Sequence, residues 1–291
     1  MALRAMIIAA SLMIAAPATA QLAPFKDDLF AYRPALETNS AGDVTIPYNR
    51  ELDMVQRDKV LRRKAHDRFV DTSVRWSRRV RSYASPNGTQ KKFEVGAYNG
   101  GAKVTVIYVH GKGGNRRQGV NDWTFGGNFN RLQNLMVRNG GLLLTPDFSG
   151  FGRKGALDIK ALATHARVLS PRGKLYIACG SMGGSICWQM ASQPATAALM
   201  DGIILLGARW NDNFLKSATM QRNTRDMPIL VAHGTADQVF PHSGWRSYLS
   251  KLRSKRRDYP VRMVSFESGV HGTPIRMIDW RGELNRLMTN R

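Results

Sequence analysis

The sequence predicts an α/β protein in which a mostly parallel, twisted sheet is covered by helices on both faces. Three observations predict this fold class. From residue 90 onward, short apolar runs alternate with longer stretches of helical periodicity. Several runs, such as 140–148 and 201–207, are apolar almost throughout, which is typical of strands buried on both faces. The 291 residues are 43% hydrophobic and 22% charged, which suits a large core and excludes a disordered chain.

The expected elements follow one another along this part of the chain. Two strands, 92–98 and 103–109, flank Asn99-Gly100-Gly101, which is a hairpin signal. Further strands are expected at 140–148, 174–180, 201–207, 228–234 and 261–267, and helices at 128–139, 157–169, 181–192, 243–255 and 274–288. Because the stretch 208–227 between two of these strands is short, we expect no large cap domain.

The first 20 residues have the pattern of a secretory signal peptide. A cationic start is followed by an apolar run over 5–16 and by the small-residue ending Ala18-Thr19-Ala20, so we expect cleavage before Gln21. The run is too short to span a membrane, which takes about 20 residues. We therefore expect a periplasmic or secreted protein.

Residues 21–90 are expected to form an N-terminal extension of a catalytic domain that covers 91–291. The part up to residue 50 is irregular in pattern. From 51 to about 81, apolar residues three and four apart between many charges predict a basic helix. Pro86-Asn87-Gly88 is a turn signal that ends the extension.

The sequence has two cysteines, Cys179 and Cys187. In an exported protein they would lie in an oxidising compartment, where disulfides form. Cys179 falls on an expected strand and Cys187 on the helix that follows. A strand and the helix packed on it lie about 10 Å apart, whereas a disulfide needs Cα atoms within roughly 7 Å. We therefore favour two buried free thiols, with a disulfide as the alternative.

Unusual residues follow the carboxyl ends of four expected strands, which is the edge where open parallel sheets bind ligands. Ser181 follows the strand 174–180 directly, so it lies at a tight strand-to-helix turn. Asp237 and His271 follow two later strands, and the glycine-rich loop 110–119 (HGKGGNRRQG) follows an earlier one. A hydroxyl, an imidazole and a carboxylate can act as nucleophile, base and orienting acid.

With these residues in this order, the chain resembles the α/β-hydrolase family over residues 90–291. The segment ACGSMGG (178–184) resembles the family's G-x-S-x-G nucleophile elbow, with Cys179 in place of the first glycine. The resemblance implies the α/β-hydrolase fold, with Ser181 as nucleophile, His271 as base and Asp237 as acid.

The resemblance also implies an oxyanion hole made by the backbone N–H groups of Met182 and Lys112. It implies an acyl-enzyme intermediate and no cofactor. No cluster of histidines, cysteines or carboxylates has metal-ligand spacing, and no glycine-rich loop matches a nucleotide fingerprint.

Each proposed catalytic residue has a plainer interpretation. Ser181 could be a helix N-cap, Asp237 a turn residue and His271 an ordinary loop histidine. His110 and His233 precede glycines at strand ends, and we expect them to be structural.

The net charge of +22 points to anionic partners. Basic residues lie on the loops that follow strands, and the expected substrate contacts are Gly111, Arg116, Arg117, Arg153 and Arg209. Our hypothesis is an acyl substrate, small or attached to a surface, that is anionic, with peripheral contact to an acidic envelope surface. No nucleic-acid-binding motif accompanies the charge, so no nucleic acid is expected.

The function expected from these observations is that of an exported serine hydrolase acting on carboxylic esters or related acyl bonds. A serine peptidase or a thioesterase on the same fold is one alternative. The other is a non-catalytic envelope protein that binds acidic polymers or lipid headgroups. A pure binding protein has no physical need for the complete set of serine, histidine and acid.

Overall fold

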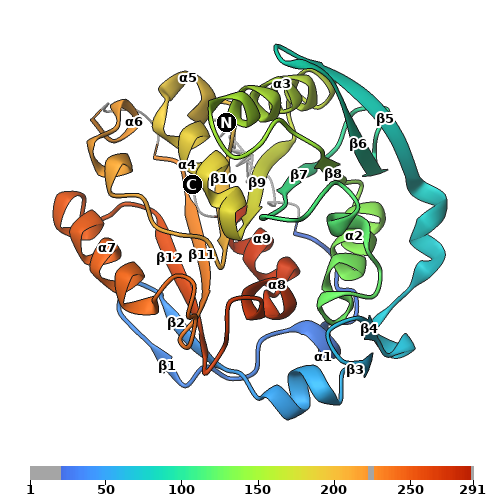
Figure 1. The fold of residues 1–291 in the computed structure, drawn as a ribbon, viewed down its shortest axis with the longest axis vertical. Coiled ribbons are helices and arrows are strands. Elements are labelled where there is room, and N and C mark those ends of the chain that lie inside the picture. Colours follow the sequence, from blue (N-terminus) through green and yellow to red (C-terminus); the bar gives the residue numbers. More distant parts are fainter. Residues whose placement is uncertain (1–20, 222–225, 290–291) are drawn as a thin grey trace, which may run out of the picture.

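The computed structural model describes residues 21–221 and 226–289, and in this part of the chain ten strands form one sheet (Figure 1). Their order across the sheet is β1-β2-β12-β11-β10-β9-β7-β8-β6-β5. The strands are β1 (Glu37–Thr38), β2 (Val44–Pro47), β5 (Arg78–Ser85), β6 (Gly88–Gly96), β7 (Val104–Val109), β8 (Leu142–Pro146), β9 (Lys174–Gly180), β10 (Gly202–Leu206), β11 (Ile229–Gly234) and β12 (Val261–Glu267).

Every neighbouring pair from β2 across to β8 is parallel, while β1 at one edge and β6 and β5 at the other are antiparallel. The prediction of a mostly parallel sheet is therefore confirmed. Because the central strands run the same way, their carboxyl ends share one edge of the sheet. That edge carries the candidate site.

Helices cover both faces of the sheet (Figure 1). Side chains alternate between two cores, so that Ile107 and Val109 of β7 join one core and Val106 and Tyr108 the other. The first core includes residues of α3, α4, α5 and α7, and the second includes residues of α2, α8 and α9. The helices are α1 (Asp27–Phe30), α2 (Asn128–Arg138), α3 (Arg153–Leu169), α4 (Gly184–Ser192), α5 (Pro194–Ala197), α6 (Ala218–Gln221), α7 (His242–Lys255), α8 (Thr273–Met277) and α9 (Trp280–Thr289).

The single helix expected from 51 to about 81 is wrong. The structure has instead a π-helical turn η1 (Glu51–Val55), a two-stranded ribbon of β3 (Asp58–Val60) and β4 (Lys64–Ala65), and the 3-10 turns η2 (Asp67–Phe69) and η3 (Thr72–Ser77) before β5. Tertiary contacts override the helical spacing here. The guanidinium of Arg57 lies 4.4 Å from the ring centre of Phe30 and 4.8 Å from that of Phe69, and Ala65 N–H donates to the carbonyl oxygen of Trp123.

The hairpin expected between 92–98 and 103–109 is also wrong, because β6 pairs with β5 and β8 and not with β7. The turn at Pro86 and Asn87 joins β5 to β6 instead. Gly101 N–H donates to the carbonyl oxygen of Leu169 at the end of α3. This bond ties the loop after β6 to a helix, and the chain crosses to β7 two positions away in the sheet.

Residues 21–90 supply β1, β2 and β5 to the sheet. The division of the chain at residue 90 remains a prediction from the sequence pattern.

The expected signal peptide, 1–20, lies outside the described residues. Within the described residues, no helix is both long enough and apolar enough to span a membrane. Between β10 and β11, the described residues contain η7 (Asp212–Lys216) and α6, with no large cap domain.

Candidate active site

Ser181 lies at the turn between β9 and the helical segment formed by η6 (Ser181–Gly183) and α4. Its φ of 49° is in the left-handed region, which is strained for a residue with a side chain. The turn is tight because two glycines, Gly183 and Gly184, follow it closely. A Cβ on Gly183 would lie 2.7 Å from the carbonyl oxygen of Val109, and one on Gly184 would lie 2.5 Å from the Cβ of Ala208. The glycines therefore let the helix approach the sheet closely and project the serine from its edge.

The structure brings Ser181, His271 and Asp237 together. The Nε2 atom of His271 lies 2.8 Å from Ser181 Oγ, and its Nδ1 atom lies 2.8 Å from Asp237 Oδ2. With the proton on Nδ1, the imidazole donates to the carboxylate and accepts the serine O–H. Asp237 follows β11 and His271 follows β12, so the parallel strands bring together residues that are 90 and 34 positions apart in sequence.

The carboxylate of Asp237 is fixed from several directions. Its side chain has no exposed surface, and Oδ1 accepts hydrogen bonds from the backbone N–H groups of Val239 at 2.8 Å and Phe240 at 3.0 Å. Phe240 also presents its ring to His271, with ring centres 5.5 Å apart. The side chains of Asp237 and His271 are thus both in contact with the loop after β11.

His233 forms a hydrogen bond that holds the loop after β11 in place. This buried imidazole lies with Nε2 2.7 Å from the carbonyl oxygen of Phe240, to which it donates, and 3.4 Å from Asp237 Oδ2. Burial is the main cause that lowers the pKa of His233, which favours the neutral form of the ring. The structural role that the sequence indicates for His233 is consistent with these contacts.

The glycine-rich loop after β7 lies against Ser181. A Cβ on Gly111 would lie 3.0 Å from Ser181 Cβ and 3.6 Å from Ser181 Oγ. Gly114 N–H donates to the carbonyl oxygen of Gly111, which closes a turn around Lys112. Met182 directly follows Ser181 at the start of a helical segment, where backbone N–H groups have no partner within the helix.

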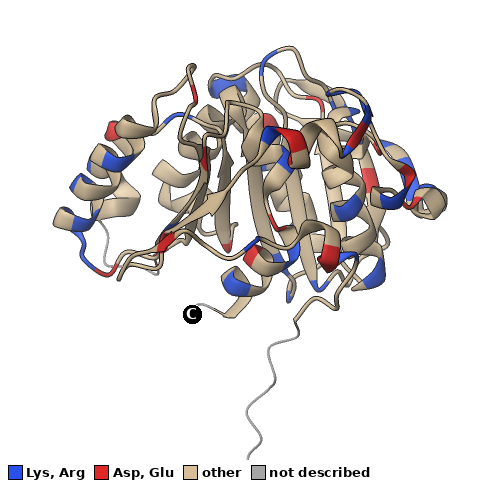
Figure 2. Cartoon of the chain, turned by 90° about the horizontal axis from the view of Figure 1, so that it is seen from below, with Lys and Arg blue, Asp and Glu red and all other residues tan. Residues whose placement is uncertain are grey.

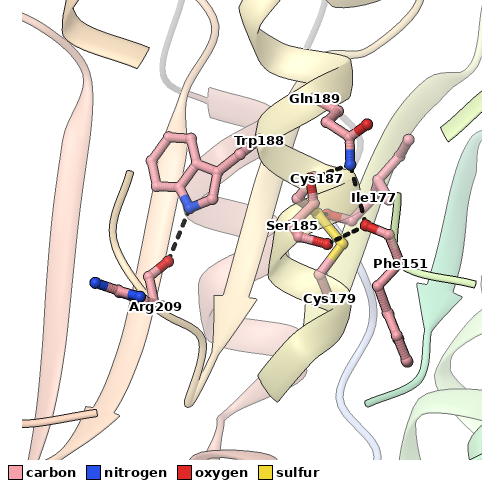
Figure 3. Close-up of a disulfide and its surroundings, with 8 residues drawn as sticks. All are labelled: Phe151, Ile177, Cys179, Ser185, Cys187, Trp188, Gln189 and Arg209. Atoms are coloured by element: carbon pink, nitrogen blue, oxygen red, sulfur yellow. Dashed lines mark hydrogen bonds between the residues drawn. A yellow bond between two sulfur atoms is a disulfide. The ribbon is translucent and has the colours of Figure 1, made fainter. Parts of the chain in front are cut away.

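Cys179 and Cys187 form a disulfide, so the expectation of free thiols is wrong (Figure 3). Their Cα atoms are 6.2 Å apart, within the range that a disulfide allows. The typical strand-to-helix spacing refers to the helix axis, and a residue on the near side lies about 2.3 Å closer to the strand. Gly183 and Gly184 bring the helix closer still. The bridge joins β9 to the first turn of α4 and encloses Ser181.

A cleft of about 720 Å³ opens beside Ser181. The indole N–H of Trp188 donates to the carbonyl oxygen of Arg209, which fixes the wall opposite α4 (Figure 3). Three aromatic side chains contribute to the cleft, and none was singled out from the sequence. The lining includes Ser181, Met182, Trp188, Arg209, Trp210 and Phe240.

The arginines expected to surround the site are not brought together there. Arg116 forms an ion pair with Asp147 and is therefore already neutralised. Arg117 and Arg153 are exposed and do not line the cleft that contains Ser181, whereas Arg209 does. Basic and acidic positions are spread over the whole ribbon (Figure 2). Residues 21–221 and 226–289 contain no group of three or more His, Cys, Asp or Glu side chains placed to hold a metal ion.

Comparisons with known proteins find similarity in structure alone. No family model matches the chain, and no curated protein is similar to it in sequence. An α/β serine hydrolase without a lid from Xanthomonas campestris has a TM-score of 0.51 at 18% identity, over 72% of this chain and 93% of that one. An esterase from Pyrococcus furiosus has a TM-score of 0.56 at 14% identity, over 75% and 94%. An α/β serine hydrolase homologue from Coxiella burnetii has a TM-score of 0.50 at 18% identity, over 72% and 96%. At these identities the likeness establishes a shared fold.

Proposed function

We propose that this chain, which has the α/β-hydrolase fold, is an exported serine hydrolase that cleaves carboxylic esters or related acyl bonds. One observation carries the proposal: Ser181, His271 and Asp237 form an unbroken chain of hydrogen bonds at the carboxyl edge of the sheet. Each distance is 2.8 Å, which suits proton transfer between the groups. Export rests on the sequence pattern of residues 1–20.

The first half of the proposed reaction forms an acyl-enzyme. His271 Nε2 takes the proton from Ser181 as Oγ attacks the carbonyl carbon of the ester, and the carbonyl electrons move to the oxygen. The tetrahedral intermediate then collapses, the bond to the leaving oxygen breaks, and His271 returns the proton to that oxygen. Asp237 holds the imidazole in the required tautomer and stabilises its positive form.

In the second half of the reaction, water takes the place of Ser181 as the attacking group. His271 takes a proton from a water molecule, whose oxygen attacks the acyl carbon. Collapse of the second intermediate releases the acid, and the proton returns to Ser181 Oγ. The backbone N–H groups of Met182 and Lys112 are the proposed donors to the negative oxygen in both halves, and one such donor is worth about 3 kcal/mol.

The cleft beside Ser181, with a volume of about 720 Å³, has room for the acyl group of the ester. Trp188, Trp210 and Phe240 provide flat apolar walls, and the described residues place no large cap over them. Apolar contact with such walls contributes about 25 cal/mol for each Å² removed from water. Thioesters and amides pass through the same kind of tetrahedral intermediate, so they should be tested as substrates beside carboxylic esters.

Hydrolysis of 4-nitrophenyl acetate by the mature protein tests the proposal. Ser181→Ala is expected to lower kcat by about 10⁶-fold, because it removes the nucleophile. Ser192→Ala is the matched control: its hydroxyl lies at the far end of α4, donates to the backbone carbonyl oxygen of Trp188, and does not line the cleft that contains Ser181. Equal rates for wild type and Ser181→Ala would contradict the proposal and favour a binding protein.

A further inference from the structure

A second pocket, of about 410 Å³, has His271 among its lining residues. It does not include Ser181 in its lining. Its walls come from segments far apart in the sequence: the N-terminal segment, the loop before α2, and the loops that carry Asp237 and His271. They include Tyr48, Met54, Arg62, Phe125, Val239 and Val270.

We propose that this pocket binds the leaving group of the ester, and that Arg62 binds an anionic substituent on that leaving group. The inference rests on the proposed function and deepens it, since it assigns a substrate class: esters of an apolar alcohol or phenol that carries a carboxylate or similar anion. It also gives residues 48–62 a role, as one wall of the substrate site.

The chemistry of the reaction assigns the pocket to the leaving group. His271 must return its proton to the leaving oxygen, so the leaving group lies beside this imidazole and the acyl group lies beyond Ser181. Ser181 and Met182 line the large cleft, whereas His271 lines the second pocket. The two halves of an ester therefore have separate places on either side of the reacting atoms.

The walls of the pocket favour an apolar group. Val239 and Val270, from the loops after β11 and β12, keep 56% and 46% of their surface exposed although both are large hydrophobic residues. Both face this pocket, together with Phe125 and Met54. An apolar ring placed there removes these side chains from water, which favours binding.

The charge of the pocket is positive and resides on Arg62. No aspartate or glutamate is among the lining residues, and the two arginines that line it differ in their partners. Arg276 is buried, and its guanidinium donates to both carboxylate oxygens of Asp58, at 3.0 and 2.6 Å. Arg62 is exposed, and among the described residues no acidic side chain forms an ion pair with it. Arg62 is therefore available to a ligand.

The backbone fixes Arg62 at this position. Its φ is +62° and that of Phe125, which also lines the pocket, is +51°, so two residues with side chains hold the left-handed conformation in one pocket. Such strain is concentrated at binding and catalytic sites and persists only where the surroundings impose it. Here Asp58 imposes it, since its Oδ2 accepts the N–H of Arg62 at 3.0 Å while the same carboxylate holds Arg276.

Two chromogenic esters test the proposal in the full mature chain: 4-nitrophenyl acetate and 3-carboxy-4-nitrophenyl acetate, which differ by one carboxylate on the leaving group. Arg62→Gln is expected to lower the ratio of kcat/KM for the anionic ester to that for the neutral ester by about threefold, the effect of an exposed ion pair. Arg62→Lys should keep most of the ratio. The loss should shrink in about 1 M salt, where exposed charges are screened.

Arg63→Gln is the matched control, because Arg63 is the exposed neighbour of Arg62, carries the same charge and does not line the pocket. An unchanged ratio in Arg62→Gln, or an equal change in Arg63→Gln, would overturn the proposal. If the wild type hydrolyses neither ester, the proposed function fails. The pocket can then be tested separately, by measuring how tightly it binds the free leaving group. Calorimetry with 5-hydroxy-2-nitrobenzoate should show weaker binding to Arg62→Gln than to Arg63→Gln, and equal affinity would overturn the pocket assignment.

Discussion

A Cβ atom on Gly111 would lie 3.0 Å from the Cβ of Ser181 and 3.1 Å from the carbonyl oxygen of Gly180. The glycine-rich loop after β7 therefore contacts Ser181, the proposed nucleophile, at a residue without a side chain. Because Lys112 follows Gly111, this contact sets how far the proposed N–H donor of Lys112 lies from the negative oxygen that forms when Ser181 attacks the carbonyl carbon.

Gly111→Ala is expected to push the loop away from Ser181 and to lower kcat by about tenfold or more, while the overpacking lowers the free energy of unfolding by about 1–3 kcal/mol. Steady-state kinetics and urea unfolding measure the two effects. Gly152→Ala is the control, since a Cβ there meets nothing within 4 Å and φ is −96°. Wild-type kcat in Gly111→Ala would show that the loop takes no part.

Asp237→Asn is expected to lower kcat by about 10⁴-fold with little change in the melting temperature. The amide oxygen can still accept from the N–H groups of Val239 and Phe240, so the loop should stay in place. The amide nitrogen then faces His271 Nδ1 and favours the wrong tautomer. Kinetics with 4-nitrophenyl acetate measure the fall, and a loss of less than about tenfold would rule out Asp237 as the orienting acid.

The Cys179–Cys187 bridge is expected to stabilise the folded protein. It closes a loop with a sequence separation of 8, for which the chain-entropy model gives about 2.5 kcal/mol. The double variant Cys179→Ala/Cys187→Ala should lose about that much free energy of unfolding, measured by urea denaturation. Dithiothreitol should destabilise the wild type and leave the double variant unchanged. Equal unfolding midpoints for wild type and double variant would contradict this prediction.

The stability of the fold should fall in mild acid because of His242. Burial, with smaller contributions from His233 and Arg246, lowers the pKa of His242 from 6.5 to about 4. Between these two values the unfolded chain binds more protons than the folded one, so the free energy of unfolding decreases as the pH falls from 6.5 toward 4.

His242→Gln tests this, since glutamine does not titrate and can still bond to Ser265, whose Oγ lies 2.8 Å from His242 Nε2. Urea unfolding at several pH values should show a weaker pH dependence in the variant. The same slope in both proteins would show that His242 is not responsible.

The sequence could predict most of the sheet and the meeting of the three catalytic candidates. Strands that are apolar throughout are recognisable one by one, and β9 and β12 have the bounds expected from the pattern. Parallel strands also place their carboxyl ends at one edge of the sheet. The proximity of Ser181, Asp237 and His271 could therefore be predicted without knowing the conformations of the loops. Phe240 lies three positions after Asp237 in the segment 235–241, and this closeness in sequence is a signal that identifies it as a candidate site residue.

Other features depend on tertiary contacts that leave no local pattern. Ala65 and Phe69 are spaced as on a helix, yet they lie in two different short elements, β4 and η2, and are buried in one small cluster with Phe30. The disulfide depends on how closely two glycines let α4 approach β9. Arg62 reaches the site only because its segment folds back beside His271, and nothing in its neighbourhood of the sequence distinguishes it from other arginines.

Labelling of the mature protein with a fluorophosphonate probe, followed by peptide mass spectrometry, tests the central claim most directly. The account predicts one covalent adduct on Ser181 in the wild type, and none in Ser181→Ala or in His271→Ala, where the serine loses its base. No adduct in the wild type, or an equal amount of labelling in Ser181→Ala, would contradict it.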